Sequence, residues 1–161
     1  MANKQPNSRM CFVCGLENSS GLCLHFYDDG RDTVWSQFVI ADAHQGFPGV
    51  VHGGISAAIL DEVGCRTMMI GAPERFGMTA KLELRYREPV PQGVPLKAIG
   101  RLIKDRGRLV SAEAVVQALD GRILTEASVL VADLPPGKLH LDQVDVLGWR
   151  VYPDPAGEPG G

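Results

Sequence analysis

The chain has 161 residues, of which 45% are hydrophobic and 22% charged, and its formal net charge at pH 7 is −3. These values are typical of one globular domain, and they exclude a disordered chain, a collagen-like repeat and a disulfide-rich scaffold. The pI of about 5.8 argues against a nucleic-acid-binding domain, because such domains are usually strongly basic.

The elements that the sequence predicts follow one another in a simple order. They are a flexible terminus (1–10), strands at 22–28 and 33–40, a Gly/Pro-rich loop at 41–51, a helix at 52–70, strands at 78–88, 94–104, 109–119 and 122–132, and a Pro/Gly-rich appendage at 134–161. Strands in runs with a single helix predict an α+β fold, with the helix against an antiparallel sheet.

The predicted helix is apolar almost all round, so we expect it to be buried on more than one side. Gly71 and Pro73 end it. Two acids, Asp61 and Glu62, lie inside this apolar stretch. Adjacent residues point about 100° apart on a helix, so these carboxylates are not expected to form a close pair.

The strand over 78–88 has two distinct faces. Alternation places Leu82 and Tyr86 on the apolar face and Thr79 with Lys81 and Arg85 on the other. We therefore expect the Thr79 hydroxyl to point away from the apolar face.

The start of the helix carries the sequence His52-Gly53-Gly54. A helix N-terminus offers unpaired N–H groups and the positive end of the helix dipole, which can hold a developing oxyanion. Asp61 follows two and a half turns later, and a carboxylate in an apolar helix is costly unless it is partnered or reactive. The alternative is that the glycines serve helix–sheet packing and Asp61 is a satisfied buried group.

Three segments carry a resemblance to a known family. Residues 52–61 resemble the HGG-x6-D signature of hotdog-fold acyl-CoA thioesterases, closest to the phenylacetate-pathway-like (PaaI-like) branch. Residues 11–15 with Asn18, Gly21 and Leu22 are similar to the amino-terminal stretch of one branch, and residues 44–49 resemble the segment before its HGG. The resemblance implies a hotdog thioesterase domain over 11–133, in which a curved sheet wraps around one long central helix.

The resemblance also implies the roles of four residues. Asp61 matches the helix carboxylate that acts as nucleophile or general base, and Gly53 the residue whose N–H polarises the thioester carbonyl. His52 orients the site, and Thr79 positions the attacking water. The site in these enzymes lies between two subunits, which implies a homodimer that can pair into a tetramer. It requires no cofactor beyond the coenzyme A of the substrate.

The substrate-binding residues are expected around the same glycines. Gly54 lies beside the oxyanion donor, and His44 and Gln45 precede it in the loop. Many relatives carry an Asn at the position of Gly46. Two interpretations stay open: His44 or Gln45 takes over the role of this Asn, or the water network near the oxyanion differs.

The middle of the chain is basic, since residues 51–110 carry 10 basic and 6 acidic side chains. Arg and Lys bind phosphate well, so we expect Lys104 and Arg106 to hold the nucleotide end of coenzyme A. The alternative is an ordinary solvated surface.

The four cysteines are expected to be thiols in a cytoplasmic protein, because the sequence shows neither a signal peptide nor a membrane span. Cys11, Cys14, Cys23 and His25 could alternatively form a Cys3His zinc set. We favour free or buried thiols and no metal, because a chain of this length folds without one.

The sequence thus predicts hydrolysis of an acyl-CoA thioester, with no nucleic-acid or membrane partner. Two other classes stay open: a non-catalytic module that binds acyl-CoA or acyl carriers, and a hotdog enoyl-thioester hydratase. A zinc-dependent regulatory module is a third alternative.

Overall fold

The computed structural model describes residues 2–134 and 144–154. Its elements are β1 (Asn3–Lys4), β2 (Tyr27–Asp28), β3 (Thr33–Phe38), the 3-10 helix η1 (Asp42–His44), β4 (Gln45–Phe47), β5 (Val50–Val51), α1 (Gly53–Cys65), the 3-10 helix η2 (Arg66–Met69), β6 (Gly77–Tyr86), β7 (Leu96–Asp105), β8 (Leu109–Ala118), β9 (Ile123–Asp133) and α2 (Val144–Leu147). Seven strands form one antiparallel sheet in the order β1-β2-β3-β7-β8-β9-β6.

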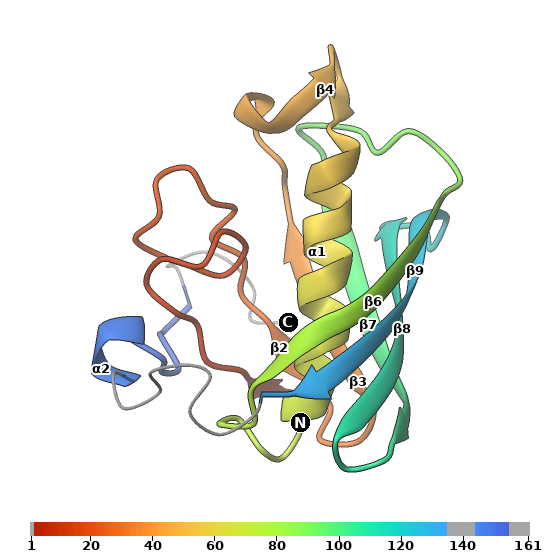
Figure 1. Cartoon of the computed structure of the whole chain (residues 1–161). Coiled ribbons are helices and arrows are strands. Elements are labelled where there is room, and N and C mark those ends of the chain that lie inside the picture. The colour runs from red at the N-terminus through yellow and green to blue at the C-terminus, as the bar shows by residue number, and fades with distance from the viewer. Residues whose placement is uncertain (1, 135–143, 155–161) are drawn as a thin grey trace.

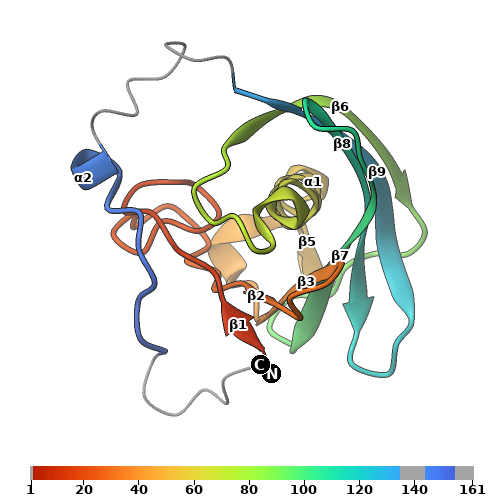
Figure 2. The same cartoon turned by 90° about the horizontal axis from the view of Figure 1, so that it is seen from below.

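The sheet curves around α1, which runs along its concave face (Figures 1 and 2). The amino-terminal segment covers another side of the helix, as the view along the helix axis in Figure 2 shows. Ile59, Leu60 and Val63 of α1 are buried in the core. The predicted α+β architecture, a curved antiparallel sheet around one helix, is confirmed.

The helix lies very close to the sheet, and a small residue makes this approach feasible. A Cβ atom on Gly100 of β7 would lie 2.3 Å from the carbonyl oxygen of Val63. Real Cβ atoms do not come this near, so any larger residue at position 100 would push α1 away from the sheet.

The helix is shorter than the apolar pattern predicts. His52 is its N-cap rather than its first residue, and the α-helix ends at Cys65. Residues 66–69 continue as a tighter 3-10 turn, η2. Tightening of the last turn is a common helix end, and an apolar periodicity alone does not distinguish it from continued α-helix.

The predicted orientation of the Thr79 side chain, away from the apolar face of its strand, is wrong. The register of β6 against β9 shifts between Thr79 and Lys81, which marks a β-bulge at Ala80. One extra residue in a strand reverses the alternation of all residues before it. Thr79 therefore points toward α1, on the same side as Leu82 and Tyr86.

The amino-terminal residues are packed, in contrast to the flexible terminus that we expected over 1–10. Residues 3–4 form β1, and the side chains of Gln5 and Asn7 are 3% and 0% exposed. The Asn7 side-chain amide donates to the carbonyls of Cys14 and Leu24 at 2.7 and 2.8 Å. Polar composition suggested a loose end, but the amide nitrogens of Asn7 and Gln5 find acceptors elsewhere in the chain.

The strand expected over 22–28 is reduced to β2. Its first half bonds instead to the amino-terminal segment, since the N–H groups of Leu22 and Leu24 donate to Phe12 and Val13. The loop expected over 41–51 in turn contains a short two-stranded ribbon, β4 and β5, beyond the amino end of α1 (Figure 1).

The carboxy-terminal appendage packs onto the domain in the part that the structure describes. Trp149 donates from Nε1 to the carbonyl of Pro73 at 2.9 Å, and Arg150 pairs with Asn7 across an antiparallel bridge. Residues 135–143 and 155–161 of the expected appendage lie outside the described residues.

Candidate functional site

Asp61 is held by a side chain of the neighbouring strand. Thr79, near the start of β6, donates from its hydroxyl to Oδ1 of Asp61 at 2.5 Å. The sulfur of Cys65, one turn after Asp61, lies 2.9 Å from the same hydroxyl oxygen. Because Thr79 has one hydroxyl proton and gives it to Asp61, the Cys65 thiol is the donor in the second contact. The three groups form a chain from Cys65 through Thr79 to Asp61.

Burial controls the ionisation of this chain. Desolvation raises the pKa of Asp61 above its usual range, and the nearby Glu62 charge raises it further, while the Thr79 hydrogen bond opposes both effects. Burial also raises the pKa of Cys65 to about 12, so this thiol keeps its proton at neutral pH. The result is a partly desolvated carboxylate, which is a stronger base than an ordinary aspartate.

The first two backbone N–H groups of α1 differ in their hydrogen bonding. The ring of His52 accepts from the N–H of Gly54 at 2.9 Å through Nδ1, which caps the helix. Gly53 is the first residue of the helix, and its N–H has no acceptor within the helix. Within the described residues, the Gly54 N–H is thus engaged in capping, whereas no acceptor is found for the Gly53 N–H.

A pocket of about 630 Å³ opens at this end of the helix. Its lining combines the β4–β5 ribbon, the first turn of α1 and the segment after β6, and consists of Gly46, Phe47, Val50, Val51, His52, Gly53, Ser56, Tyr86, Arg87, Glu88, Pro89 and Val90. Tyr86 donates from its hydroxyl to the carbonyl of Gly53 at 2.8 Å. The phenol thereby fixes the peptide that follows the free N–H group.

One chain does not bring Gly53 and Asp61 to the same substrate atom. They are eight residues apart on one helix, which corresponds to about 12 Å along its axis. The two ends of β6 contact different groups of α1: Thr79, near its start, donates to Asp61, and Tyr86, at its end, donates to the carbonyl of Gly53. The two functional groups predicted from the sequence are therefore present but separated within the chain.

The other expected binding residues lie outside this pocket's lining. His44 is turned toward the amino-terminal segment, where Nε2 lies 3.3 Å from the carbonyl of Ser20 and the ring meets Phe12 edge-on. Gln45 pairs with Val51 in the ribbon. The structure places Gly46 itself, not these two neighbours, in the lining.

Lys104 and Arg106 lie at the β7–β8 turn, at the end of the sheet where α1 ends (Figure 1). They line a smaller pocket of about 250 Å³ with Leu109, Ser111 and Leu130. Gly53 lies at the opposite end of the helix. A single chain thus keeps these two basic residues away from its own oxyanion donor.

Sequence reasoning missed Tyr86 and Cys65 as members of the site. Tyr86 was expected on the apolar face, which is correct, but its hydroxyl needs a polar partner and finds it at the helix end. Cys65 lies one helical turn after Asp61, and this i, i+4 spacing was the signal that could have found it.

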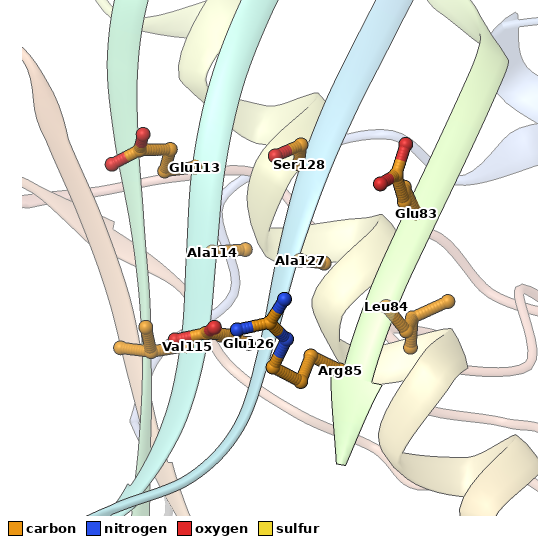
Figure 3. Close-up of a pocket in the computed structure, with 9 residues that line it drawn as sticks. All are labelled: Glu83, Leu84, Arg85, Glu113, Ala114, Val115, Glu126, Ala127 and Ser128. Carbon is orange, nitrogen blue, oxygen red and sulfur yellow. The ribbon is translucent and has the colours of Figure 1, made fainter. Parts of the chain in front are cut away.

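A second pocket, of about 390 Å³, lies over β6, β8 and β9, with α1 on the other side of the sheet (Figure 3). Glu83, Glu113 and Glu126 line it together with Arg85. Carboxylates outnumber cations there, so it does not suit a phosphate-rich ligand, and it shares no lining residue with the pocket at the amino end of α1.

The cysteines group differently from the Cys3His alternative. Among the described residues, Cys11 and Cys14 come together with Glu62, and neither Cys23 nor His25 belongs to this cluster. Cys23 is exposed and directs its thiol to the carbonyl of Gly15.

Comparisons with known proteins find similarity to thioesterases. The thioesterase superfamily profile matches residues 48–125. Acyl-coenzyme A thioesterase THEM4 of Rattus norvegicus is 35% identical over 137 residues, which cover 84% of this chain and 58% of that protein. The mouse protein of the same name is 36% identical over 95 residues, 58% of this chain and 40% of that protein. The chain thus spans about half the length of these curated relatives.

Solved structures share the fold. Protein RHA08564, a thioesterase superfamily protein, matches with a TM-score of 0.68 and 32% identity over 76% of this chain and 62% of that chain. Protein smu.793 of Streptococcus mutans, solved bound to acetyl CoA, matches with a TM-score of 0.58 and 16% identity over 63% of this chain and 81% of that chain. Across the described residues, no helix combines the length and apolarity that a membrane crossing requires.

Proposed function

We propose that the chain is a member of the thioesterase superfamily, whose profile matches residues 48–125, and that it hydrolyses an acyl-CoA thioester to a free acid and coenzyme A. The observation that carries the proposal is the partly desolvated Asp61 carboxylate, held by Thr79 on a strand that also reaches the free N–H end of the same helix. The chain's similarity to acyl-coenzyme A thioesterase THEM4, at 35% sequence identity, supports acyl-CoA as the substrate class. The PaaI-like branch remains part of this proposal.

A second copy of the chain can bring a Gly53 N–H group close to Asp61. β6 is an edge strand of the sheet, and an edge strand can pair with another chain. Two identical strands that pair antiparallel bring the Thr79 end of one close to the Tyr86 end of the other. Asp61 of each chain then approaches the Gly53 N–H of its partner. We propose this homodimer, with a site at each end of the β6 pair; two dimers pair further into a tetramer.

In the proposed reaction the Gly53 N–H of one chain binds the thioester oxygen, and the dipole of α1 stabilises the negative charge that develops there. Along one route, Asp61 takes a proton from water, which attacks the carbonyl carbon; the C–S bond breaks and the proton passes to the coenzyme A thiolate. Along the other, Asp61 itself attacks and releases the thiolate, and water hydrolyses the resulting anhydride. Thr79 orients the reacting oxygen of Asp61 in either case.

The two routes differ in where oxygen from water ends. A single turnover in heavy-oxygen water places the label in the acid product alone if Asp61 is a general base. Label found in Asp61 by peptide mass spectrometry demonstrates the anhydride.

The phosphates of coenzyme A need cations, and we propose Lys104 and Arg106 for this role. Arg106→Ala is expected to raise KM for acyl-CoA several-fold while kcat changes little, and the effect should shrink at high salt, because exposed charges are screened. An unchanged KM removes Arg106 from the proposal.

Thiol release from a panel of short, long and aromatic acyl-CoAs tests the activity. Wild type is expected to turn over at least one class, and Asp61→Asn to lose turnover. Asp120→Asn, in the exposed turn between β8 and β9, is the matched control and should keep full activity. An enzyme-only reaction corrects for the protein's own thiols.

Each failure of this assay leads to a different conclusion. If wild type releases no thiol from any acyl-CoA but binds coenzyme A, the chain is a binding module rather than a hydrolase. If wild type hydrates an enoyl-CoA without releasing thiol, it is a hydratase. Activity that survives in Asp61→Asn moves the chemistry away from α1.

A further inference from the structure

A second side-chain cluster lies on a different face of α1 from Asp61. The sulfurs of Cys11 and Cys14 and a carboxylate oxygen of Glu62 lie within 4.8 Å of one another. Cys11 Sγ is 3.8 Å from Glu62 Oε2. The cluster joins residues 51 positions apart in the chain, Cys11 and Glu62, and the thioester chemistry proposed above uses none of the three.

The backbone around the cysteines is shaped to support a thiolate. The N–H of Cys14 donates to Cys11 Sγ at 3.5 Å, and the N–H of Gly15 donates to the carbonyl of Cys11 at 2.8 Å. A Cβ atom on Gly15 would lie 2.3 Å from that carbonyl oxygen, so the turn closes only with glycine there.

The charges around the cluster are suited to a divalent cation. Glu62 pairs through Oε1 with Arg66 Nε at 2.9 Å, and the Arg66 side chain is 1% exposed. If metal binding displaces both thiol protons, the two thiolates and the carboxylate carry three negative charges, and Arg66 balances only one of them. A dication balances the other two, so that the loaded cluster is neutral, and this is the condition under which buried charges are tolerated.

The geometry also suits zinc in particular. Zinc binds thiolate sulfur at about 2.3 Å and carboxylate oxygen at about 2.1 Å, which sets neighbouring tetrahedral ligand atoms about 3.6 to 3.8 Å apart. The 3.8 Å between Cys11 Sγ and Glu62 Oε2 agrees with this spacing. Ser8 Oγ lies 3.6 Å from Cys14 Sγ, so this hydroxyl or a water can complete four ligands.

We propose that Cys11, Cys14 and Glu62 bind a zinc ion that fastens the amino-terminal segment to α1. Arg66 acts as an outer partner that orients the Glu62 carboxylate. The site replaces both the free thiols and the Cys3His set that the sequence suggested, since Glu62 takes the place of Cys23 and His25. The ion is structural, because Glu62 faces the amino-terminal segment while Asp61 faces Thr79 on β6.

Metal analysis of the untagged full chain, purified without added chelator, is the first test. We expect about one zinc per chain in wild type and in the matched control Cys23→Ser. Cys11→Ser and Cys14→Ser should each lose it. Zinc that is retained in both of these variants, or lost equally in Cys23→Ser, overturns the assignment.

Cobalt titration keeps the test independent of how the variants fold. Reduced, metal-free wild type is expected to develop a thiolate-to-cobalt charge-transfer band that saturates at one equivalent and disappears when zinc is added. Glu62→Gln should weaken binding by at least the roughly 10-fold that loss of an outer partner costs. Wild type that carries no zinc and gives no such band contradicts the proposal, as does a Cys11–Cys14 disulfide in protein purified under reducing conditions.

Discussion

Asp61 and Glu62 are neighbours on α1, but their carboxylates enter two different environments. Asp61 faces β6, where its partner is the neutral hydroxyl of Thr79. Glu62 faces the amino-terminal segment, and its partner is the buried guanidinium of Arg66, one turn later at the C-cap of α1. Desolvation without a countercharge raises the pKa of Asp61. One residue of rotation on a helix therefore separates a carboxylate desolvated beside a neutral hydroxyl from a carboxylate paired with a buried guanidinium.

The largest expected difference between the Asp61 side and the Glu62 side of α1 is the effect of a substitution on kcat. Asp61→Asn should lower kcat by about 10²- to 10⁴-fold, the usual contribution of a positioned acid–base group. Glu62→Gln, the matched amide substitution one residue later, should stay within several-fold of wild type at temperatures where it is folded. Thiol-release rates for both variants provide the check. Equal losses would mean that the two sides are not functionally distinct.

For stability we expect the reverse order, with Glu62→Gln the more damaging of the two substitutions. Glu62→Gln leaves the buried Arg66 charge without its partner, which should cost about 3 kcal/mol in the free energy of unfolding. Asp61→Asn should instead stabilise the protein at neutral pH. Because the pKa of Asp61 is higher in the folded state than in the unfolded state, its ionisation destabilises the fold above that raised pKa.

Urea unfolding as a function of pH measures both effects on metal-free protein. The advantage of Asp61→Asn over wild type should vanish as the pH falls below the ordinary carboxyl range, where Asp61 is protonated in both states. An Asp61→Asn variant that is less stable than wild type at neutral pH would contradict the assignment of Asp61 as a desolvated, uncompensated carboxylate.

The cysteines on the two sides should differ in reactivity by at least about tenfold. Hydrogen bonding lowers the pKa of Cys11 to about 7, whereas burial beside Asp61 raises that of Cys65 to about 12. The thiolate is the reactive species, so iodoacetamide at neutral pH should modify Cys11 in the metal-free protein well before Cys65. Peptide mass spectrometry over a time course gives the two rates, and faster labelling of Cys65 would refute the difference.

The smallest expected effect concerns Thr79. Its hydrogen bond lowers the pKa of Asp61, so Thr79→Val should raise that pKa further. Activity requires the carboxylate form, so the acid limb of the kcat/KM profile should move to higher pH and activity near it should fall several-fold. Thr79→Ser, which keeps the hydroxyl, should restore the wild-type limb. A limb that is identical in all three proteins would exclude this role of Thr79.

Much of the fold, and the residues proposed for the site, could be predicted from local sequence patterns. Alternation located the long strands of the sheet within a few residues, because a half-buried strand must alternate. The glycines after His52 and the acid at position 61 indicated a helix-end donor and a helix carboxylate. These features depend on neighbours in sequence, which a single chain displays directly.

Pairings between distant residues could not be predicted in the same way. The bulge at Ala80, which turns Thr79 toward Asp61, depends on the register of β6 against β9. Packing of the amino terminus depends on carbonyls from residues 14 and 24 that accept from Asn7. The contact of Cys11 with Glu62 likewise exists only once the amino-terminal segment lies against α1.

The sequence by itself determined the central helix, the five long strands that match β3 and β6–β9, their order and the chemical groups, because hydrophobic period and turn residues are local properties. Only the tertiary structure decided which of two adjacent acids loses water without gaining a countercharge, because desolvation depends on the segments that pack around a side chain. It also separated Gly53 from Asp61 by about 12 Å, since both lie on one rigid helix. That distance is the physical reason for proposing that two chains together form the site.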